Sequence, residues 1–247
     1  MRAEPSYARR AVAMMGLALL GLVPTTTIPA QRPAKPATKA GSATTLPNGR
    51  SIPIATAGFD QGRPAGLFYR LKVDLTSGTR LEVRTFLFMA GNRMTRTFPS
   101  GGGDVFDPSR CNPDMCGSYQ FDADQIAVRW DNGQVDRWPY RRTAEGVDLD
   151  GSIFKPARPL TGAVLIGTWG GAATTGNPTE NVYAFNPDGT FTIGAGRSSV
   201  GGRYSVRGLT LSLAFADGLH KRRTLFAAGT SEPIGLIAVD GDVYRRR

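Results

Sequence analysis

The sequence predicts an all-β protein built from two tandem, antiparallel, barrel-like meander units that are related by internal duplication, and three observations support this. One hairpin pattern occurs twice without a gap, at residues 117–133 and 202–218. Apolar and polar residues alternate in many segments, as in 209–215, which is typical of half-buried strands. Asn-Gly and Asp-Gly pairs recur between these segments, and such pairs form tight hairpin turns.

The duplication extends beyond the hairpin and is interrupted once. Residues 147–151 match residues 237–241 at a spacing of 90, and residues 86–94 match residues 183–191 at a spacing of 97. Because the spacing falls from 97 to 85 at the hairpin, the first copy carries twelve extra residues, within the Gly-rich and cysteine-containing segment 100–116. The matched pairs expected to share core positions are Tyr119 with Tyr204, Val128 with Leu213 and Trp130 with Phe215.

This pattern predicts four segments and leaves two architectures open. Either each unit closes as its own small barrel, which we favour because closure removes exposed strand edges, or the two units pair as one larger sheet system. The predicted segments are a signal peptide (1–30), a flexible linker rich in Pro, Ala, Lys and Thr (31–45), a first β unit with the disulfide-loop insertion (46–160) and a second β unit (161–247).

The N-terminus has the features of a secretory signal peptide. Arg9 and Arg10 precede an uncharged apolar stretch of 13 residues, from Ala11 to Val23. This is the length of a signal-peptide core and is too short to span a bilayer. Cleavage after Ala30 would leave a periplasmic or extracellular protein without a transmembrane span, and the alternative is an uncleaved N-terminal anchor.

The charge of the chain is strongly basic, at +10, and the first 30 residues hold three Arg and one Glu, so the processed chain carries +8. Such a charge favours anionic partners such as an envelope polymer. The alternative is that the charge serves solubility. No nucleic-acid-binding motif is present, so we expect no nucleic-acid partner, and the sequence does not indicate an oligomeric state.

The two cysteines, Cys111 and Cys116, are expected to form a structural disulfide. They lie close together in the segment CNPDMC, and an exported protein meets an oxidising compartment. A metal site would need further ligands nearby, and a redox pair more usually has the spacing C-x-x-C. We therefore expect no metal and no cofactor.

The second unit carries motifs that point to a known group of domains. They are Gly167-Thr168-Trp169 at its start, the segment 183–191, and Gly202-Arg203-Tyr204 with the alternating strand up to Phe215. On these motifs, residues 162–247 resemble the small bacterial lipocalin-like domains of the calycin group. Residues 66–157 resemble them in part, with Gly66-Leu67-Phe68-Tyr69 where the Gly-x-Trp motif would stand. The resemblance implies an antiparallel barrel with a cavity for an apolar ligand and a tryptophan that plugs one barrel end.

Catalytic and metal-binding patterns are scarce. A catalytic triad would have to use His220, the one histidine, which follows a turn and precedes three cations and is expected to be exposed. Nor does the chain hold a Gly-x-Ser-x-Gly motif. The acidic pairs Asp104 with Asp107 and Asp122 with Asp124 are expected to cap turns, the alternative being weak Ca²⁺ binding. We therefore predict that the protein is not an enzyme.

Aromatic and basic side chains supply the candidate ligand-binding residues. Trp138 has no aromatic counterpart in the second unit, where Arg223 stands, so it is a candidate for a stacking surface. Basic clusters fall in equivalent strands of the two units and suit phosphate or carboxylate recognition, the alternative being a solvated face. The candidates are Trp138, Tyr140, Trp169, Arg141, Arg142, Arg222 and Arg223.

These observations predict an exported, non-catalytic binding or interaction protein of the bacterial envelope. Its expected ligand is either a small apolar molecule inside a barrel or an anionic envelope polymer at the surface. Two alternatives stay open: a structural or inhibitory partner of another envelope protein that docks through the Gly-rich disulfide loop, and a hydrolase that uses carboxylates alone.

Overall fold

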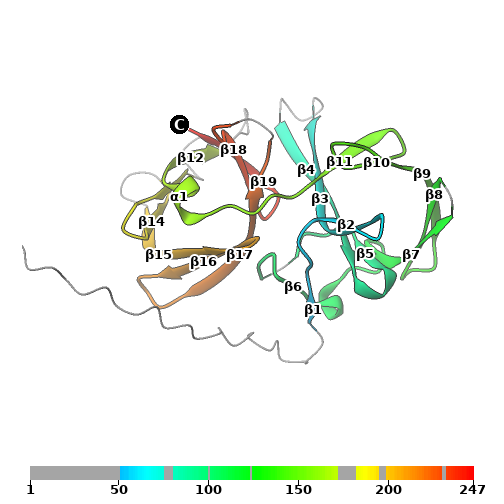
Figure 1. Cartoon of the computed structure of the whole chain (residues 1–247). Coiled ribbons are helices and arrows are strands. Elements are labelled where there is room, and N and C mark those ends of the chain that lie inside the picture. Colours follow the sequence, from blue (N-terminus) through cyan, green and yellow to red (C-terminus); the bar gives the residue numbers. More distant parts are fainter. Residues whose placement is uncertain are drawn as a thin grey trace, which may run out of the picture. The chain divides into compact units, whose positions relative to one another are not determined.

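The computed structural model describes residues 51–74, 80–99, 101–122, 124–171, 182–194, 199–229 and 232–247. The predicted signal peptide (1–30) and linker (31–45) lie outside these residues. Within them the chain forms two closed antiparallel barrels of eight strands each, which confirms the predicted fold class and excludes a single composite sheet (Figure 1). No helix in this part of the chain is long and apolar enough to cross a membrane.

The first barrel, barrel 1, is closed by pairing of its first and last strands, β3 and β11, at Phe68 with Pro156 and Tyr69 with Lys155. Its strands are β3 (Arg63–Asp74), β4 (Arg80–Met89), β5 (Arg93–Thr95), β7 (Cys116–Asp122), β8 (Gln125–Trp130), β9 (Val135–Arg142), β10 (Val147–Leu149) and β11 (Ser152–Pro156). Additional short elements are β1 (Ile52–Pro53), which pairs with β6 (Val105–Phe106), β2 (Gly58–Asp60), which pairs with β3, and the 3₁₀ turns η1 (Ala90–Asn92) and η2 (Pro108–Arg110).

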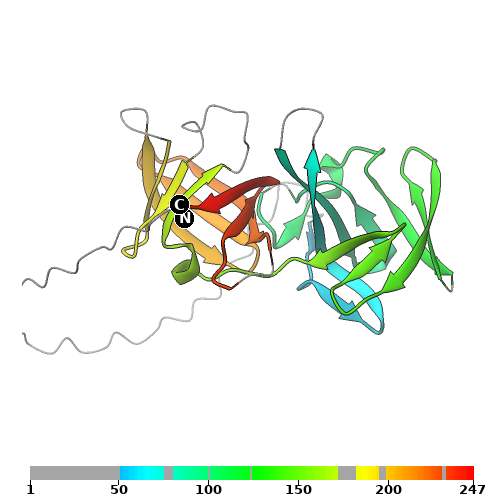
Figure 2. The ribbon, with the colours of Figure 1, turned by 90° about the horizontal axis from the view of Figure 1, so that it is seen from above.

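The second barrel, barrel 2, has the same up-and-down order and closes between β12 and β19 (Figure 2). A short helix, α1 (Gly162–Leu165), precedes it. Its strands are β12 (Gly167–Gly171), β13 (Val182–Phe185), β14 (Thr190–Ile193), β15 (Val200–Arg207), β16 (Thr210–Phe215), β17 (His220–Ala227), β18 (Leu236–Val239) and β19 (Asp242–Arg246).

The strand register shows that the two barrels are copies of one unit. Tyr119 pairs with Val128 in β7–β8, and Tyr204 pairs with Leu213 in β15–β16. The same 85-residue offset holds at every residue pair of these two ladders, and also at every pair of the β8–β9 and β16–β17 ladders. The repeat read from the sequence is therefore a repeat of hydrogen-bonding partners as well as of residue types.

The place of the Gly-x-Trp motif in barrel 1 follows from the same register. Phe68 pairs with Phe86 in β3–β4, just as Trp169 pairs with Tyr183 in β12–β13. Phe68 and Trp169 are both fully buried, and each stands two residues after a glycine with positive φ. Phe68 thus holds in barrel 1 the position that Trp169 holds in barrel 2.

Each barrel has its own apolar interior, because alternate residues of an antiparallel strand face the same side. The buried interior of barrel 1 consists of Phe68, Phe86, Phe88, Met94, Tyr119, Ile126, Val128, Trp130, Val147, Leu149 and Phe154. That of barrel 2 consists of Leu160, Leu165, Trp169, Tyr183, Phe185, Phe191, Leu211, Leu213, Leu225, Ala227, Ile237, Val239 and Tyr244.

A third apolar cluster joins outward-facing residues of both barrels, and the insertion of the first copy takes part in it. Phe226 lies 4.8 Å from Tyr69 and 6.3 Å from Phe98, measured between ring centroids, and it is stacked on Phe98. Thr224, which is fully buried, donates its hydroxyl to the carbonyl of Pro99 at 2.9 Å. The residues that precede the Gly-rich turn therefore pack inside the molecule.

The Gly-rich turn itself also lies against barrel 2. A Cβ at Gly102 would collide with the side chain of Thr210, and one at Gly103 would collide with Leu209. The next residue, Asp104, forms an ion pair with Arg222 at 2.7 Å. Gly102 and Gly103 are therefore buried within the molecule. If the disulfide loop docks another protein, these two residues are not part of the docking surface.

Candidate ligand-binding site

A half-open cavity of about 550 Å³ lies in barrel 1, between the apolar interior and solvent. Three interior aromatic residues, Phe86, Trp138 and Phe154, face it together with one arginine from β3, one from β4 and one directly after β5. Its lining residues are Arg70, Glu82, Val83, Arg84, Thr85, Phe86, Arg96, Phe98, Met115, Trp138, Leu149, Asp150, Ser152 and Phe154.

The aromatic residues form one continuous surface inside this cavity. The ring centroids of Phe86 and Phe154 are 4.7 Å apart in an edge-to-face arrangement, and those of Phe86 and Trp138 are 5.7 Å apart. Trp130, which is buried, lies behind Trp138 at 6.1 Å. Because such rings are held by their neighbours, they offer a rigid apolar wall to a ligand.

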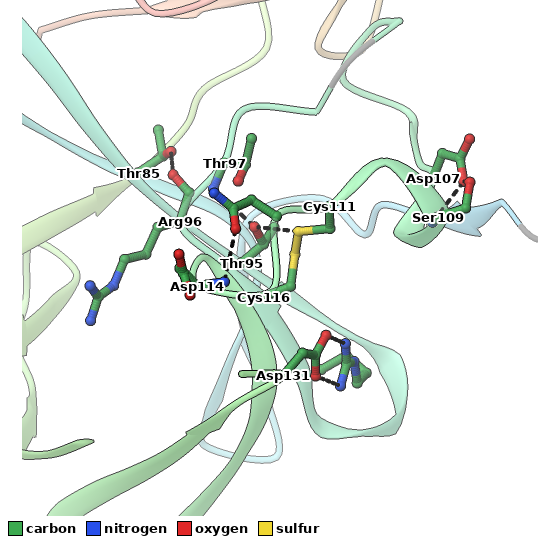
Figure 3. The surroundings of a disulfide bond; sticks show 12 residues. Thr85, Thr95, Arg96, Thr97, Asp107, Ser109, Cys111, Asp114, Cys116 and Asp131 are labelled. Atoms are coloured by element: carbon green, nitrogen blue, oxygen red, sulfur yellow. Dashed lines mark hydrogen bonds and ion pairs between the residues drawn. A yellow bond between two sulfur atoms is a disulfide. The ribbon is translucent and has the colours of Figure 1, made fainter. Parts of the chain in front are cut away.

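Arg96 extends from the end of β5 over this wall. Its guanidinium carbon lies 4.2 Å from the ring centroid of Trp130 and 4.9 Å from that of Trp138. It also pairs with Asp136 at 3.2 Å. Burial lowers the pKa of Arg96 from its ordinary value, and the nearby Asp136 partly opposes this shift. In Figure 3 the side chain points away from the disulfide, while its backbone carbonyl accepts a hydrogen bond from the hydroxyl of Thr85 at 3.2 Å.

Arg70 lies at a second point of the cavity wall. It shares a face of β3 with Phe68 and places its guanidinium carbon 5.5 Å from the ring centroid of Phe154. One of its Nη groups donates to the hydroxyl of Ser152. Arg70 and Ser152 are also the two residues that this cavity shares with a neighbouring groove of about 680 Å³, so they form the boundary between the two spaces.

Two carboxylates near the cavity, those of Glu82 and Asp136, are engaged by donors. Glu82 pairs with Arg84 at 3.4 Å, and both side chains are about half exposed. Asp136 accepts a hydrogen bond from Nε1 of Trp130 at 2.8 Å besides its contact with Arg96. These two carboxylates act as partners of cations and donors, which supports ligand binding here more than general acid–base chemistry.

Three predicted aromatic site residues take different positions. Trp138 is half-buried and lines the cavity rather than an outer surface. Tyr140 packs on Phe121 at 4.6 Å and does not line the cavity. Trp169 is fully buried in barrel 2, where its Nε1 donates to the carbonyl of Leu165 at 2.7 Å. Because it is fully buried, its side chain offers no contact to a ligand from solvent.

The four predicted arginines are each tied to another residue of the chain. Arg142 lies 4.3 Å over the ring of Phe59, measured from the guanidinium carbon to the ring centroid. The other three form ion pairs, namely Arg141 with Asp148 at 2.8 Å, Arg222 with Asp104 at 2.7 Å and Arg223 with Asp240 at 2.6 Å. Arg141 and Arg142 are exposed, whereas the side chains of Arg222 and Arg223 are each 36% exposed, so the two clusters differ in their surroundings.

Sequence reasoning missed Arg70 and Arg96, two of the three arginines that line the cavity. A signal was present, because each stands two residues after an inward-facing apolar residue, Phe68 or Met94. Residues two apart in a strand share a face, so both charges fall on the interior side of barrel 1. A charged residue on that side of a strand is unusual unless it is paired or functional.

The predicted disulfide between Cys111 and Cys116 is present (Figure 3). The hydroxyl of Thr95, a buried residue of β5, lies 3.5 Å from the sulfur of Cys111 and accepts a hydrogen bond from the backbone N–H of Thr97 at 2.9 Å. Met115, inside the disulfide loop, lines the cavity. The loop therefore supports one side of the cavity wall.

No group of three or more His, Cys, Asp and Glu residues is placed to hold a metal ion in the part of the chain that the structure describes. Asp104 is paired with Arg222, and Asp107 caps η2 by accepting a hydrogen bond from the backbone N–H of Ser109 at 3.0 Å. His220 is exposed, opposite Ala214. Comparison of the chain with protein-family models, curated proteins and solved structures finds no match.

Proposed function

We propose that this protein is an exported, non-catalytic binding protein that takes a small molecule into the cavity of barrel 1. The observation that carries the proposal is the half-open cavity of about 550 Å³ with its wall of Phe86, Trp138 and Phe154. Ligand pockets typically measure about 300–1,000 Å³ and are mainly apolar with a few placed polar groups. The lipocalin-like resemblance supports the same function.

Barrel 2 supports this assignment by contrast. The position of Trp138 is held there by Arg223, which pairs with Asp240 at 2.6 Å. Tyr183 and Tyr244 stand at the positions of the two phenylalanines and contact each other at 5.0 Å. In barrel 2 these positions are thus held by side chains that contact one another, and we assign the ligand to barrel 1.

Export accounts for the disulfide. Structural disulfides persist in oxidising compartments such as the periplasm, and the Cys111–Cys116 bond fits such a compartment. Together with the signal-peptide pattern of residues 1–30, it supports a periplasmic or extracellular protein. N-terminal sequencing of the protein recovered from outside the cytoplasm tests this part, because export with cleavage predicts a chain that begins after Ala30.

Ligand binding is tested by native mass spectrometry of the purified protein, followed by titration with small apolar probes such as naphthalene derivatives. Trp138→Leu should weaken binding by about tenfold, because it removes one wall of the cavity. Tyr140→Leu is the matched control, since Tyr140 lies two residues along the same strand and outside the cavity lining. Absence of uptake by the wild type, or equal loss in both variants, would contradict the proposal.

A further inference from the structure

The cavity of barrel 1 contains hydrogen-bond donors without acceptors. The Nε–H groups of Arg70 and Arg96 are both buried and have no partner. A buried donor without an acceptor is costly, so native proteins rarely leave one unpaired without a functional reason. Both side chains line the same cavity, and a rotation of each guanidinium would present these groups to a molecule inside it.

The arginines around these donors do not all have a carboxylate partner of their own. Arg84 and Glu82 neutralise each other at the exposed rim, and Asp136 is shared between Arg96 and Nε1 of Trp130. Arg70 has a hydroxyl as its hydrogen-bond partner, that of Ser152. Asp150, the other carboxylate of the lining, is an exposed turn residue. The inner part of the cavity therefore holds two guanidinium groups that face one shared carboxylate, that of Asp136.

The two guanidinium groups lie above rings that touch each other. Arg70 lies over Phe154 at 5.5 Å and Arg96 over Phe86 at 5.9 Å, and the two rings are 4.7 Å apart. A ligand with an anionic group at the arginines would thus place its remaining atoms against an aromatic wall. Planar guanidinium groups match the geometry of a carboxylate, with which they form paired hydrogen bonds.

Comparison with barrel 2 indicates that Arg70 and Arg96 differ from an arginine that has only a structural role. Arg223 in barrel 2 also has an unpaired Nε, but it forms an ion pair with Asp240 at 2.6 Å. The register places Gly171 at the position of Arg70 and Ile193 at that of Arg96. The interior cations of barrel 1 are therefore specific to the copy that holds the cavity.

From these contacts we infer that the ligand of barrel 1 is an organic acid, a carboxylate on an apolar body, whose charged group is held by Arg70 and Arg96. This inference rests on the proposed function, since it names the class of molecule that enters the same cavity. The groove beyond Arg70 and Ser152, lined by Leu71, Lys72 and Lys155 among others, offers a longer apolar body a second space to occupy.

The test compares 2-naphthoate with 2-naphthamide by isothermal titration calorimetry on the mature protein. The two probes have the same ring system and nearly the same size, and only the first is charged. We expect 2-naphthoate to bind at least about tenfold more tightly, because charge-assisted hydrogen bonds are roughly twice as strong as neutral ones. Arg70→Gln with Arg96→Gln should reduce this ratio to near one, because the affinity for 2-naphthoate should fall much more than that for 2-naphthamide.

Arg137→Gln is the matched control, because Arg137 is exposed on β9 next to Trp138 and does not line the cavity. It should preserve the ratio. If the double variant does not fold, the wild type still decides the question, because the affinity for 2-naphthoate should fall with rising salt while that for 2-naphthamide should not. Equal binding of the two probes would overturn the carboxylate inference alone, whereas binding of neither would overturn the proposed function as well.

Discussion

Trp138 and Arg223 occupy the same position in the two barrels of this protein. Trp138 pairs with Ile126 in the β8–β9 ladder, and Arg223 pairs with Leu211 in the β16–β17 ladder, 85 residues further on in each case. Both side chains face the interior of their barrel. The duplicated units have therefore diverged at this inward position, which holds part of an aromatic wall in barrel 1 and one member of an ion pair in barrel 2.

Two neighbouring interior positions also differ between the barrels, with an apolar ring in barrel 1 and a hydroxyl-bearing ring in barrel 2. Phe86 and Phe154 of barrel 1 correspond to Tyr183 and Tyr244 of barrel 2, at the repeat spacings of 97 and 90. The two tyrosines are buried and in edge-to-face contact. At these positions barrel 2 has tyrosines and an ion pair, whose side chains contact one another. Barrel 1 has apolar rings there, and these rings line the cavity.

The buried tyrosines of barrel 2 predict that stability falls in alkaline solution. Burial is the largest cause that raises the pKa of Tyr183 and that of Tyr244 above the ordinary value of 10.0. Their contribution is therefore complete below about pH 10, where both the folded and unfolded forms are protonated, and is lost above it, because the unfolded chain ionises first. Urea unfolding between pH 8 and about pH 12 should show this decline.

The double variant Tyr183→Phe, Tyr244→Phe should make that decline shallower, by at most about 1.4 kcal/mol per pH unit for each tyrosine removed. Tyr204→Phe is the comparison, since this tyrosine is partly exposed and its loss should change the slope less. An unchanged pH dependence in the double variant would show that these two groups do not control alkaline unfolding.

The contacts between outward faces of the two barrels predict an unequal response to two neighbouring substitutions. Phe226 is fully buried between Tyr69 and Phe98, so Phe226→Ala should lower the free energy of unfolding by about 3–5 kcal/mol. Arg222→Gln should cost only about 0–1 kcal/mol, because its ion pair with Asp104 is more than a third exposed. Equal losses in chemical denaturation would contradict this description of the interface.

Much of the fold followed from the sequence because repeated residue types carry the register. Tyr119 and Tyr204 recur at one spacing, and the ladders on either side keep it. The Asp-Gly turns at Asp150 and Asp240 have the positive φ that hairpin turns require, at 51° and 48°. In these elements, local turn chemistry and alternation both point to the same structure.

The site was harder to predict because it depends on exceptions to that alternation. Arg70, within β3, and Arg96, directly after β5, are charged residues on the inward side of the barrel, where a pattern-based interpretation expects apolar residues. Trp138 has a polar counterpart, which favoured an outer surface, but its strand register turns it inward. Only the closure of β3 against β11 brings these three residues to one cavity, and closure is a long-range property that no local pattern contains.

The disulfide predicts a moderate and local contribution to stability. Cys111 and Cys116 are five residues apart, and the loop-closure relation gives a stabilisation of about 2 kcal/mol for so short a loop. Reduction of the wild type should therefore lower the free energy of unfolding by about that amount. The double variant Cys111→Ala, Cys116→Ala should match the reduced wild type and show no response to the reductant, and a response there would place the effect elsewhere.

The glycines of the repeated hairpin predict matched effects in both barrels. Gly117 and Gly202 lie where the backbone of the neighbouring strand passes close by, and a Cβ at either would collide with a carbonyl oxygen, that of Arg129 or of Ala214. Because the obstacle is backbone, Gly117→Ala and Gly202→Ala should each cost about 1–3 kcal/mol in urea unfolding. Gly58→Ala is the control, since Gly58 has open space around it and no positive φ, and it should stay within about 0.5 kcal/mol of the wild type. A loss in one barrel without a similar loss in the other would mean that the two copies no longer share this close approach.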